Sequence, residues 1–179
     1  KSVEQISKHN LTLTYGTPTQ FRKMLPYFND PEIYKNRCLR SGIMAGEPCP
    51  PELIEQMMEL GCDIRVIYGL TESSPGTNVT RSSDPIEKKS TAGRAFRGCV
   101  VRIEDPKTGD PLDYGKDGEV VIYGPGIMLG YYKCDDQTKA ITSKWGGLKT
   151  GDMGRMDSDG YLEITGRIKN VVIRGGNNL

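Results

Sequence analysis

The sequence has very little histidine, and this scarcity limits the catalytic chemistry open to it. His9 is the single histidine among 179 residues. A serine or cysteine nucleophile of the triad type needs a histidine beside it, and His9 falls at the end of a segment with helical periodicity. The sequence therefore argues against a hydrolase that works through such a triad.

The cysteines form no recognisable pattern. There are five, an odd number, they are widely spaced and no two form a C-x-x-C pair: Cys38, Cys49, Cys62, Cys99 and Cys134. Neither a disulfide framework nor a zinc site is indicated by such spacing. We expect reduced thiols, most of them buried.

The sequence also lacks a charge bias and a long apolar run. Its 24 basic and 23 acidic residues leave a net charge of +1, which offers no electrostatic footprint for nucleic acid. No apolar stretch is long enough to span a bilayer, and the residues from Lys1 to Glu4 show no signal-peptide pattern. We expect neither a nucleic-acid partner nor a transmembrane segment, and we expect a chain that begins as though cut from a longer one.

The first ninety residues alternate between strand-like and helix-like segments. β-type runs occupy residues 11–15, 38–44 and 64–68, and helical patterns occupy residues 17–25 and 50–60. Strands that alternate with helices are typical of a parallel sheet. The sequence predicts an α/β subdomain, in part only, over residues 1–90.

Beyond residue 90 the pattern changes to short β-type runs separated by glycine, proline and aspartate. These runs are residues 100–103, 119–123, 148–153, 161–164 and 171–173. Regularly spaced short strands with turn signals indicate a small antiparallel barrel or sandwich. We predict a mostly β subdomain, a small antiparallel β-barrel, over residues 91–166.

The most informative stretch is Tyr68-Gly69-Leu70-Thr71-Glu72, which follows directly on a β-branched run. In open α/β sheets ligands bind at such strand ends. The stretch places an aromatic ring, a flexible turn, a hydroxyl and a carboxylate within five residues, and these suit a base, a phosphate and Mg²⁺. An ordinary strand-to-loop junction with an exposed Thr-Glu is the alternative.

This pentapeptide resembles the Tyr-Gly-x-Thr-Glu motif of the adenylate-forming enzymes, the superfamily of acyl-CoA synthetases, luciferase and adenylation domains. Other motifs resemble those of that family and occur in the same order along the chain. The residues around the first two motifs in chain order, which begin at Ala45 and Tyr68, are most similar to the medium-chain fatty acyl-CoA synthetases. These further motifs are Ala45-Gly46-Glu47-Pro48, Gly118-Glu119-Val120, Gly130-Tyr131-Tyr132, Thr150-Gly151-Asp152 and Gly166-Arg167-Ile168-Lys169. If the resemblance is set aside, three of these motifs have ordinary structural interpretations. The motif with Gly46 is a strand-to-helix connection, that with Asp152 is a turn with a solvated carboxylate, and that with Arg167 carries a surface arginine.

The resemblance implies a nucleotide site and a metal ligand. Tyr68 would cover one face of the adenine, Asp152 would grip the ribose hydroxyls and Arg167 would reach the ribose or phosphate. Thr71 and Glu72 would be the catalytic residues, with Glu72 as the ligand of Mg²⁺. The implied nucleotide-binding residues are Gly46, Glu47, Pro48, Tyr68, Gly69, Thr71, Asp152 and Arg167.

The resemblance also implies an acyl pocket, a hinge and a thiol tunnel. The wall of the acyl pocket would include Ser41, Gly42, Ile43 and Met44. Residues 167–179 would form the hinge, at Lys169, and the start of a truncated C-terminal domain, with Gly175 and Gly176 lining the tunnel for coenzyme A.

The implied activity is that of an AMP-forming ligase. It would activate a fatty acid, of medium chain length, with ATP and Mg²⁺, and would pass the acyl group to coenzyme A. The alternatives are an adenylating enzyme with another acceptor, or an inactive nucleotide-binding fragment. Because the family's phosphate loop and C-terminal lysine do not appear, we expect these 179 residues alone to be inactive. The resemblance implies a mitochondrial location, with the cytoplasm as the alternative.

Overall fold

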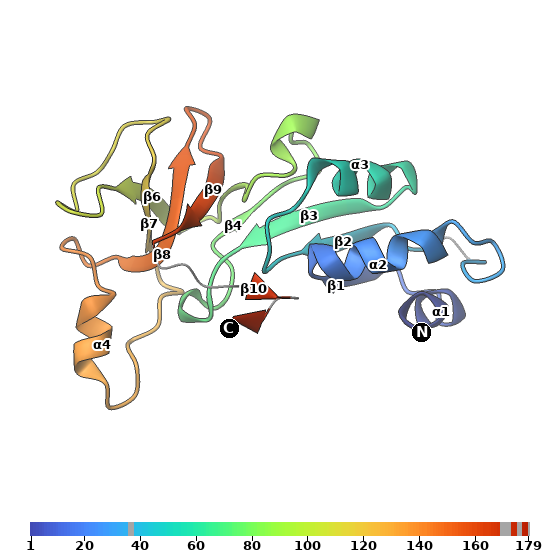
Figure 1. Ribbon diagram of the computed structural model, residues 1–179, viewed down its shortest axis with the longest axis horizontal. Helices are drawn as coiled ribbons and strands as arrows, with labels where there is room; N and C mark the ends of the chain where they lie inside the picture. The colour runs from blue at the N-terminus through green and yellow to red at the C-terminus, as the bar shows by residue number, and fades with distance from the viewer. Residues whose placement is uncertain (36–37, 169–172, 175–176, 179) are drawn as a thin grey trace. The chain divides into compact units, whose positions relative to one another are not determined.

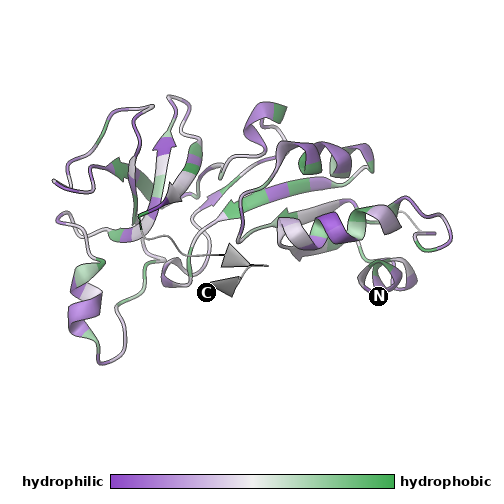
Figure 2. Cartoon of the chain, viewed as in Figure 1, coloured by the Kyte–Doolittle hydropathy of each residue, from purple (hydrophilic) through white to green (hydrophobic). Residues whose placement is uncertain are grey.

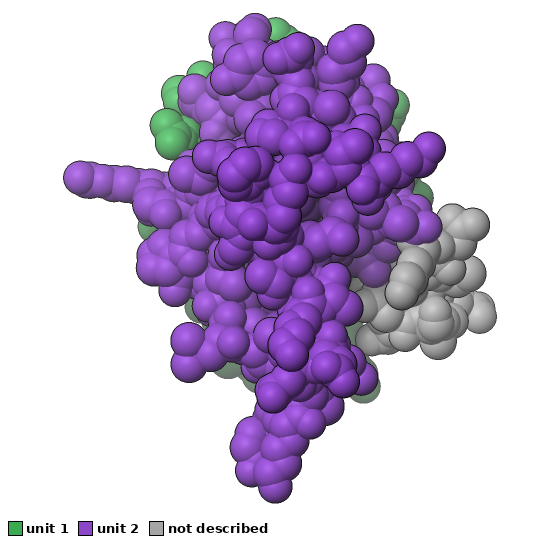
Figure 3. Space-filling view, turned by 90° about the vertical axis from the view of Figure 1, so that its left-hand side faces the viewer, with its two compact units in different colours: residues 1–66, 80–90, 172–179 green, residues 67–79, 91–171 purple. Residues whose placement is uncertain are grey.

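The computed structural model describes residues 1–35, 38–168, 173–174 and 177–178. The chain divides into two compact units, coloured separately in Figure 3. Unit 1 comprises residues 1–66, 80–90 and 172–179, and unit 2 comprises residues 67–79 and 91–171. Each unit is described by itself.

Unit 1 contains the predicted parallel sheet. Strands β1 (Leu13–Gly16), β2 (Ser41–Met44) and β3 (Asp63–Tyr68) pair in parallel, with β2 in the centre. The connections between them carry helices α2 (Pro18–Phe28) and α3 (Pro51–Glu59), as Figure 1 shows. A parallel pair needs such a crossover, since the chain must return to the same end of the sheet. The α/β prediction for the first part of the chain is confirmed.

The remaining short elements of unit 1 lie at its beginning and near its end. Helix α1 (Ser2–Lys8) opens the chain, and a single 3₁₀ turn, η2 (Ile86–Lys88), occurs in the segment that returns to this unit. Close to the C-terminus, β10 (Ile173–Arg174) and β11 (Asn177–Asn178) form a two-stranded antiparallel pair.

The start of α2 shows how the local sequence determines where a helix begins. Thr17 is the N-cap and accepts a hydrogen bond from the backbone N–H of Gln20, while the Gln20 side chain accepts one from the backbone N–H of Thr17. Pro18 occupies the first helical position, where its missing N–H costs nothing. The helix therefore begins where the sequence predicts.

The core of unit 1 lies between the helices and the sheet. Its fully buried side chains include Phe21, Met44, Ile54, Met57 and Ile64. Polar and apolar residues alternate along α2 and α3 in Figure 2, as expected for helices with one buried face. Burying each large apolar side chain contributes roughly 1.5–3 kcal/mol, so this face holds the layers together.

A charged cluster marks the beginning of β3. The carboxylate of Asp63 accepts hydrogen bonds from Ser82, from Nε of Arg65 at 3.0 Å and from Lys89 at 3.3 Å, and Lys89 itself is buried. Burial alone would raise the pKa of Asp63, but the hydrogen bonds from these three donors outweigh it and leave the pKa below its ordinary value. The cluster therefore stabilises the ionised form of Asp63.

Unit 2 is built mainly from antiparallel strands. The last two residues of β3 pair with β4 (Asn78–Val79), and β4 pairs with β5 (Arg94–Ala95). A separate sheet of four antiparallel strands has the order β6-β7-β8-β9. Its strands are β6 (Val100–Glu104), β7 (Gly118–Tyr123), β8 (Leu148–Met156) and β9 (Leu162–Arg167).

The predicted small antiparallel β-barrel is not confirmed, because the four-stranded sheet is open in the described part of the chain. Strands β6 and β9 are the two ends of the sheet order and do not pair with each other. Closing a sheet requires the strands to tilt and shift in register around an axis, and small barrels commonly use about eight strands. Four short strands are too few, so the sheet remains an open layer.

The core of unit 2 lies against this sheet. Val120, Ile122 and Leu162 are each at most 1% exposed, and Tyr68 and Leu70 pack against the same cluster. The segment after β3 thus shares a core with the second half of the chain. The proposed division into 1–90, 91–166 and 167–179 stays a prediction about domains. The described residues contain no helix long and apolar enough to cross a membrane.

Candidate functional site

Three of the predicted site residues meet in unit 2. The hydroxyl of Tyr68 donates a hydrogen bond to Oδ2 of Asp152 at 2.7 Å, and Nε of Arg167 donates one to Oδ1 at 2.6 Å. Tyr68 lies 84 residues from Asp152 in the sequence. The side chain of Asp152 is 5% exposed and that of Arg167 is 29% exposed. Each carboxylate oxygen of Asp152 therefore has one partner, and the carboxylate is fixed in orientation.

The electrostatics of this trio keep Tyr68 as a hydrogen-bond donor to Asp152. Burial raises the pKa of Tyr68 well above its ordinary value, and the nearby Asp152 carboxylate raises it further. The phenol therefore stays protonated at neutral pH and acts as a donor. A buried carboxylate is costly unless it is paired, and Arg167 supplies the opposite charge.

A β-bulge explains how Asp152 reaches this position. On β7, Glu119 pairs with Met153 and Val121 pairs with Lys149, so three residues of β8 oppose one residue of β7. Gly151 has a φ of 73°, a conformation that suits glycine. The three bulged residues are the Thr-Gly-Asp motif itself.

Strand pairing and a hydroxyl then order the carboxylate. Asp152 is directly opposite Arg167 in the register of β8 and β9. The hydroxyl of Thr150 donates to the carbonyl of Val120 at 2.7 Å and accepts from the backbone N–H of Asp152 at 3.1 Å. The pairing of Asp152 with Arg167 is therefore set by the sheet rather than by a flexible loop.

The loop after β3 is closed tightly at Gly69. A Cβ atom at this position would lie 1.9 Å from the carbonyl oxygen of Pro75, so any larger residue would open the loop. The loop contains a 3₁₀ turn, η1 (Thr71–Ser73), in which the buried Ser73 hydroxyl donates to the carbonyl of Leu70 and accepts from its N–H. Thr71 is exposed at the start of this turn. The turn thus presents Thr71 to solvent on a fixed backbone.

Glu72 is held by a loop from the second half of the chain. The hydroxyl of Tyr131 donates to Oε1 of Glu72 at 2.6 Å, and the backbone N–H of Met128 donates to the Glu72 carbonyl at 2.8 Å. The hydrogen bond to Glu72 raises the pKa of Tyr131. In the described residues Oε2 of Glu72 has no hydrogen-bond partner in the protein. The carboxylate therefore offers one oxygen with its lone pairs available.

This donor set fits Mg²⁺ rather than a metal that needs a full protein cage. No group of three or more His, Cys, Asp or Glu side chains suited to a metal occurs among the described residues. Mg²⁺ is commonly held by one or two carboxylates together with water and substrate phosphates. A single half-buried carboxylate such as Glu72 meets that requirement.

The predicted adenine-side residues lie in unit 1, directly after β2. Gly46 has a φ of 83°, so its conformation calls for glycine although a Cβ would meet only Thr17, at 3.9 Å. The carboxylate of Glu47 accepts two hydrogen bonds from Thr19, at 2.7 Å from the hydroxyl and 3.2 Å from the backbone N–H. Pro48 is exposed. The part of Gly46, Glu47 and Pro48 in nucleotide binding stays a prediction.

The predicted acyl-pocket residues occupy strand β2 and alternate between its two faces. Gly42 and Met44 are buried in the core of unit 1, where a Cβ on Gly42 would lie 2.7 Å from Cδ1 of Ile64. Ser41 and Ile43 are half-buried on the other face, and the Ser41 hydroxyl donates to the carbonyl of Asp63. Only Ser41 and Ile43 therefore project away from this closed core.

The remaining predicted residues fall outside the part of the chain that the structure describes. These are the hinge residue Lys169 and the tunnel residues Gly175 and Gly176.

The family of the chain follows from a comparison with known protein families. The model for the family described as "AMP-binding enzyme" matches residues 1–132, which is most of the chain. The chain belongs to the AMP-binding enzyme family.

Two relatives illustrate how far the likeness to full proteins extends. The protein YngI of Bacillus subtilis is 41% identical over an alignment of 180 positions that covers 99% of this chain and 33% of YngI. The protein named medium-chain acyl-CoA ligase ACSF2, mitochondrial, from Danio rerio is 37% identical over an alignment of 183 positions that covers 99% of this chain and 30% of that protein. The chain thus spans about a third of the length of these relatives.

Solved structures of two synthetases have the same fold. The amide bond synthetase McbA from Marinactinospora thermotolerans is 25% identical, with a TM-score of 0.89 over 99% of this chain and 36% of McbA. The o-succinylbenzoate CoA synthetase MenE from Bacillus subtilis is 27% identical, with a TM-score of 0.85 over the same shares of the two chains. The mixed parallel and antiparallel sheets found here are therefore those of adenylate-forming enzymes.

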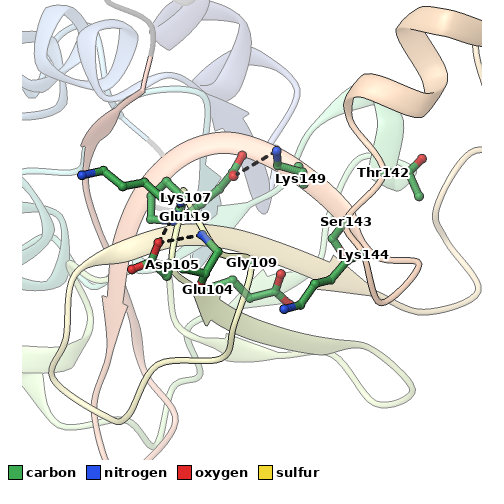
Figure 4. Close-up of a pocket in the computed structure, with 11 residues that line it drawn as sticks. Glu104, Asp105, Lys107, Gly109, Glu119, Thr142, Ser143, Lys144 and Lys149 are labelled. Atoms are coloured by element: carbon green, nitrogen blue, oxygen red, sulfur yellow. Dashed lines mark hydrogen bonds and ion pairs between the residues drawn. The ribbon is translucent and has the colours of Figure 1, made fainter.

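A polar cavity in unit 2 has none of the predicted site residues in its lining (Figure 4). It has a volume of about 180 Å³, and two buried glutamates, Glu104 and Glu119, line it from directly opposite positions on β6 and β7. Tyr123 donates to Glu104, and Lys149 lies 3.7 Å from Glu119. These partners satisfy the two carboxylates, so the cavity is explained as a polar network of the sheet.

Tyr131 is the residue whose contact the sequence did not predict. It belongs to the Gly130-Tyr131-Tyr132 motif, which resembles the family without indicating a partner. Its contact with Glu72 joins residues 59 positions apart. In the sequence the position is recognisable only as a glycine followed by two tyrosines. That motif does not indicate which of the two tyrosines contacts Glu72.

Proposed function

We propose that the chain is the nucleotide-holding part of an AMP-forming acyl-CoA ligase. The observation that carries the proposal is the buried Asp152 carboxylate, held at its two oxygens by Tyr68 and Arg167. Three residues of separate family motifs converge within one compact unit. Membership of the AMP-binding enzyme family, and relatives named acyl-CoA ligases, support the same activity.

The proposed nucleotide contacts use the chemistry of this trio. An ionised carboxylate has about four lone-pair sites, so Asp152 retains acceptor capacity for ribose hydroxyls beside Tyr68 and Arg167. The ring of Tyr68 offers an aromatic face for the adenine. Gly46, Glu47 and Pro48 are further nucleotide-binding residues in this proposal. Gly69 allows the backbone to turn sharply beside the ligand.

The proposed reaction has two steps. In the first, an oxygen of the fatty acid carboxylate attacks the α-phosphorus of ATP, the bond to the bridging oxygen breaks, and pyrophosphate leaves with the electron pair. In the second, the sulfur of coenzyme A attacks the acyl carbonyl of the mixed anhydride, AMP leaves, and the thiol proton passes to solvent. Adenylation is needed because a free carboxylate has a poor leaving group.

The chain's own contribution to the first step is positioning and neutralisation of charge. The exposed hydroxyl of Thr71 donates a hydrogen bond to a phosphate oxygen, and Glu72 holds Mg²⁺. When bound, Mg²⁺ supplies positive charge to the phosphates of ATP. Both residues sit on the short turn that Gly69 and Ser73 close, so they act from a preorganised backbone.

The proposed substrate and the remaining proposed sites are supported by the likeness to the relatives and by the family motifs. We propose a medium-chain fatty acid, as in the name of ACSF2. Its pocket wall would use β2, with Ser41 and Ile43 nearest the ligand and Gly42 and Met44 supporting them. Lys169 would be the hinge, and Gly175 with Gly176 would line the coenzyme A tunnel. A mitochondrial location is proposed on the same likeness.

An adenylating enzyme with another acceptor is the second candidate. The observation in its favour is the likeness to the amide bond synthetase McbA, with a TM-score of 0.89. Both candidates share the adenylation half-reaction and differ only in the nucleophile that takes the acyl group. Incubating full-length protein with ATP and a fatty acid, with either coenzyme A or an amine, distinguishes them by whether a thioester or an amide forms.

Exchange of labelled pyrophosphate into ATP tests the proposed function. The full-length protein is assayed with octanoate, and Glu72→Gln is expected to reduce exchange by about 100-fold or more, since a metal ion contributes several kcal/mol to such steps. Glu55→Gln is the matched control because Glu55 is exposed on α3. No fatty-acid-dependent exchange by the wild-type protein, or equal rates for Glu72→Gln and Glu55→Gln, would contradict the proposal.

A further inference from the structure

The loop between β7 and α4 (Asp135–Ala140) meets the turn of Glu72 at three places, all within unit 2. Tyr131 donates to the Glu72 carboxylate at 2.6 Å, and Met128 N–H donates to the Glu72 carbonyl at 2.8 Å. In addition, the hydroxyl of Ser74 donates to the carbonyl of Gly126 at 2.8 Å. The Met128 contact holds the backbone of the turn, and the Ser74 contact holds the residue that follows the turn through its side chain. Only the contact of Tyr131 reaches the carboxylate.

Tyr131 is itself held in place from its other side. Its backbone N–H donates to the hydroxyl of Thr138 at 2.9 Å, and that hydroxyl donates to the carbonyl of Cys134 at 3.1 Å. Gly130 has a φ of 150°, and a Cβ there would lie 3.0 Å from the side chain of Thr138. The neighbouring Tyr132, by contrast, is 85% exposed. Of the two adjacent tyrosines, therefore, only Tyr131 is built into a chain of contacts.

We propose that Tyr131 is a positioning residue that orients the Glu72 carboxylate toward the divalent cation bound with ATP. The proposal rests on the function proposed above, in which Glu72 holds that cation. Tyr131 touches neither the metal nor the reacting atoms. It engages Oε1 of Glu72, whereas Oε2 has no hydrogen-bond partner among the described residues.

Two effects of this hydrogen bond oppose each other, and they predict opposite results. Donation to the carboxylate withdraws electron density and would by itself weaken metal binding. Fixing the carboxylate removes the entropy cost of ordering it on binding and would strengthen metal binding. Partners that hydrogen-bond to metal ligands usually raise metal affinity, and their loss costs about 10- to 100-fold. We therefore expect orientation to dominate.

The test measures how much Mg²⁺ strengthens ATP binding, not catalysis. In the full-length protein, ATP affinity is determined calorimetrically with Mg²⁺ and with EDTA, and the ratio of the two affinities is the readout. Tyr131→Phe is expected to lower this ratio by about 10-fold while ATP binding in EDTA stays unchanged. Tyr132→Phe, which removes the same hydroxyl from an exposed ring, is expected to leave the ratio as in wild type.

A further variant keeps the proposal testable if Tyr131→Phe does not fold. Thr138→Val retains both tyrosine hydroxyls but removes the acceptor for the Tyr131 backbone, and it is expected to lower the ratio by about 3-fold, less than the loss of Tyr131 itself. An unchanged or increased ratio in Tyr131→Phe, or in Thr138→Val where the first variant is lost, overturns the proposal.

Glu72→Gln separates failure of this proposal from failure of the proposed function. If Glu72→Gln keeps the wild-type ratio, Glu72 does not hold the cation, and both the metal role proposed for Glu72 and the positioning role of Tyr131 are wrong. If Glu72→Gln abolishes the effect of Mg²⁺ and Tyr131→Phe has no effect, only the positioning role is overturned. If both lower the ratio and Tyr132→Phe does not, the positioning role is supported.

Discussion

The hydrogen bond between Tyr68 and Asp152 makes a measurable prediction about stability. Tyr68→Phe removes the donor and retains the packed ring, so it leaves Oδ2 of the buried carboxylate without its partner. Arg167→Met removes the charge partner and retains much of the apolar stem. In both variants the carboxylate of Asp152 stays in place while one of its two oxygens loses its donor.

The contacts of Asp152 indicate how much unfolding free energy each variant should lose, and which of the two should lose more. A hydrogen bond to a charged group contributes about 1.5–3 kcal/mol, and we expect Tyr68→Phe to lower the unfolding free energy by about 2 kcal/mol. Removing one partner of a buried ion pair costs about 3–5 kcal/mol, and Arg167→Met should fall near the lower end because Arg167 is 29% exposed. Tyr68→Phe therefore corresponds to a fall in Tm of about 4–8 °C for a chain of this size.

Urea and thermal unfolding of the 179-residue chain measure these changes. Tyr114→Phe is the control, since Tyr114 is 67% exposed in the same unit. A double-mutant cycle with Asp152→Asn should give a coupling energy of about 1–2 kcal/mol between Tyr68 and Asp152. The reasoning fails if Tyr68→Phe and Tyr114→Phe agree to within about 0.5 kcal/mol, the ordinary scatter of surface substitutions.

Two further predictions concern other parts of the chain. Gly69→Ala should lower the unfolding free energy by about 2–4 kcal/mol, because its Cβ would lie 1.9 Å from the Pro75 carbonyl oxygen. Gly166→Ala is the control and should change the unfolding free energy little, because a Cβ at Gly166 would have no atom within 4 Å. Equal urea midpoints for the two variants would contradict this prediction. Asp63→Asn should cost about 1 kcal/mol at pH 7. The pKa of Asp63 in the folded state lies below its unfolded value near 4, so this loss should vanish as the pH falls through the folded pKa. Urea unfolding of wild type and Asp63→Asn between pH 2 and 7 measures this. A difference in unfolding free energy that stays constant over this range would contradict the interpretation.

The local features of the fold could be predicted from the sequence because each depends on neighbouring residues. Thr17, Pro18 and Gln20 lie within four positions, and together they form the helix start that the structure shows. The alternation of strands and helices before residue 90 likewise indicated a parallel sheet, which is confirmed. Caps and hydrophobic periodicity act over one or two turns of chain, so they can be recognised without knowing the fold.

Strand pairing in the second half could not be predicted in the same way. Short runs separated by turn signals correctly indicated antiparallel strands, but the predicted barrel is an open four-stranded sheet in the described residues. The number of strands and their spacing do not say which strand edges meet. That depends on tilt, register and the burial of each face, all of which involve distant parts of the chain.

The sequence by itself determined the family motifs and their order, the α/β character of the first part and the types of residue available for a nucleotide. Only the tertiary structure decided that Tyr68 and Arg167 hold one carboxylate and that Tyr131, rather than Tyr132, reaches Glu72. The physical reason is range. Residue chemistry and local conformation are encoded by neighbours, whereas a hydrogen bond between residues 59 or 84 positions apart exists only once a common core and a bulged strand bring them within 3 Å.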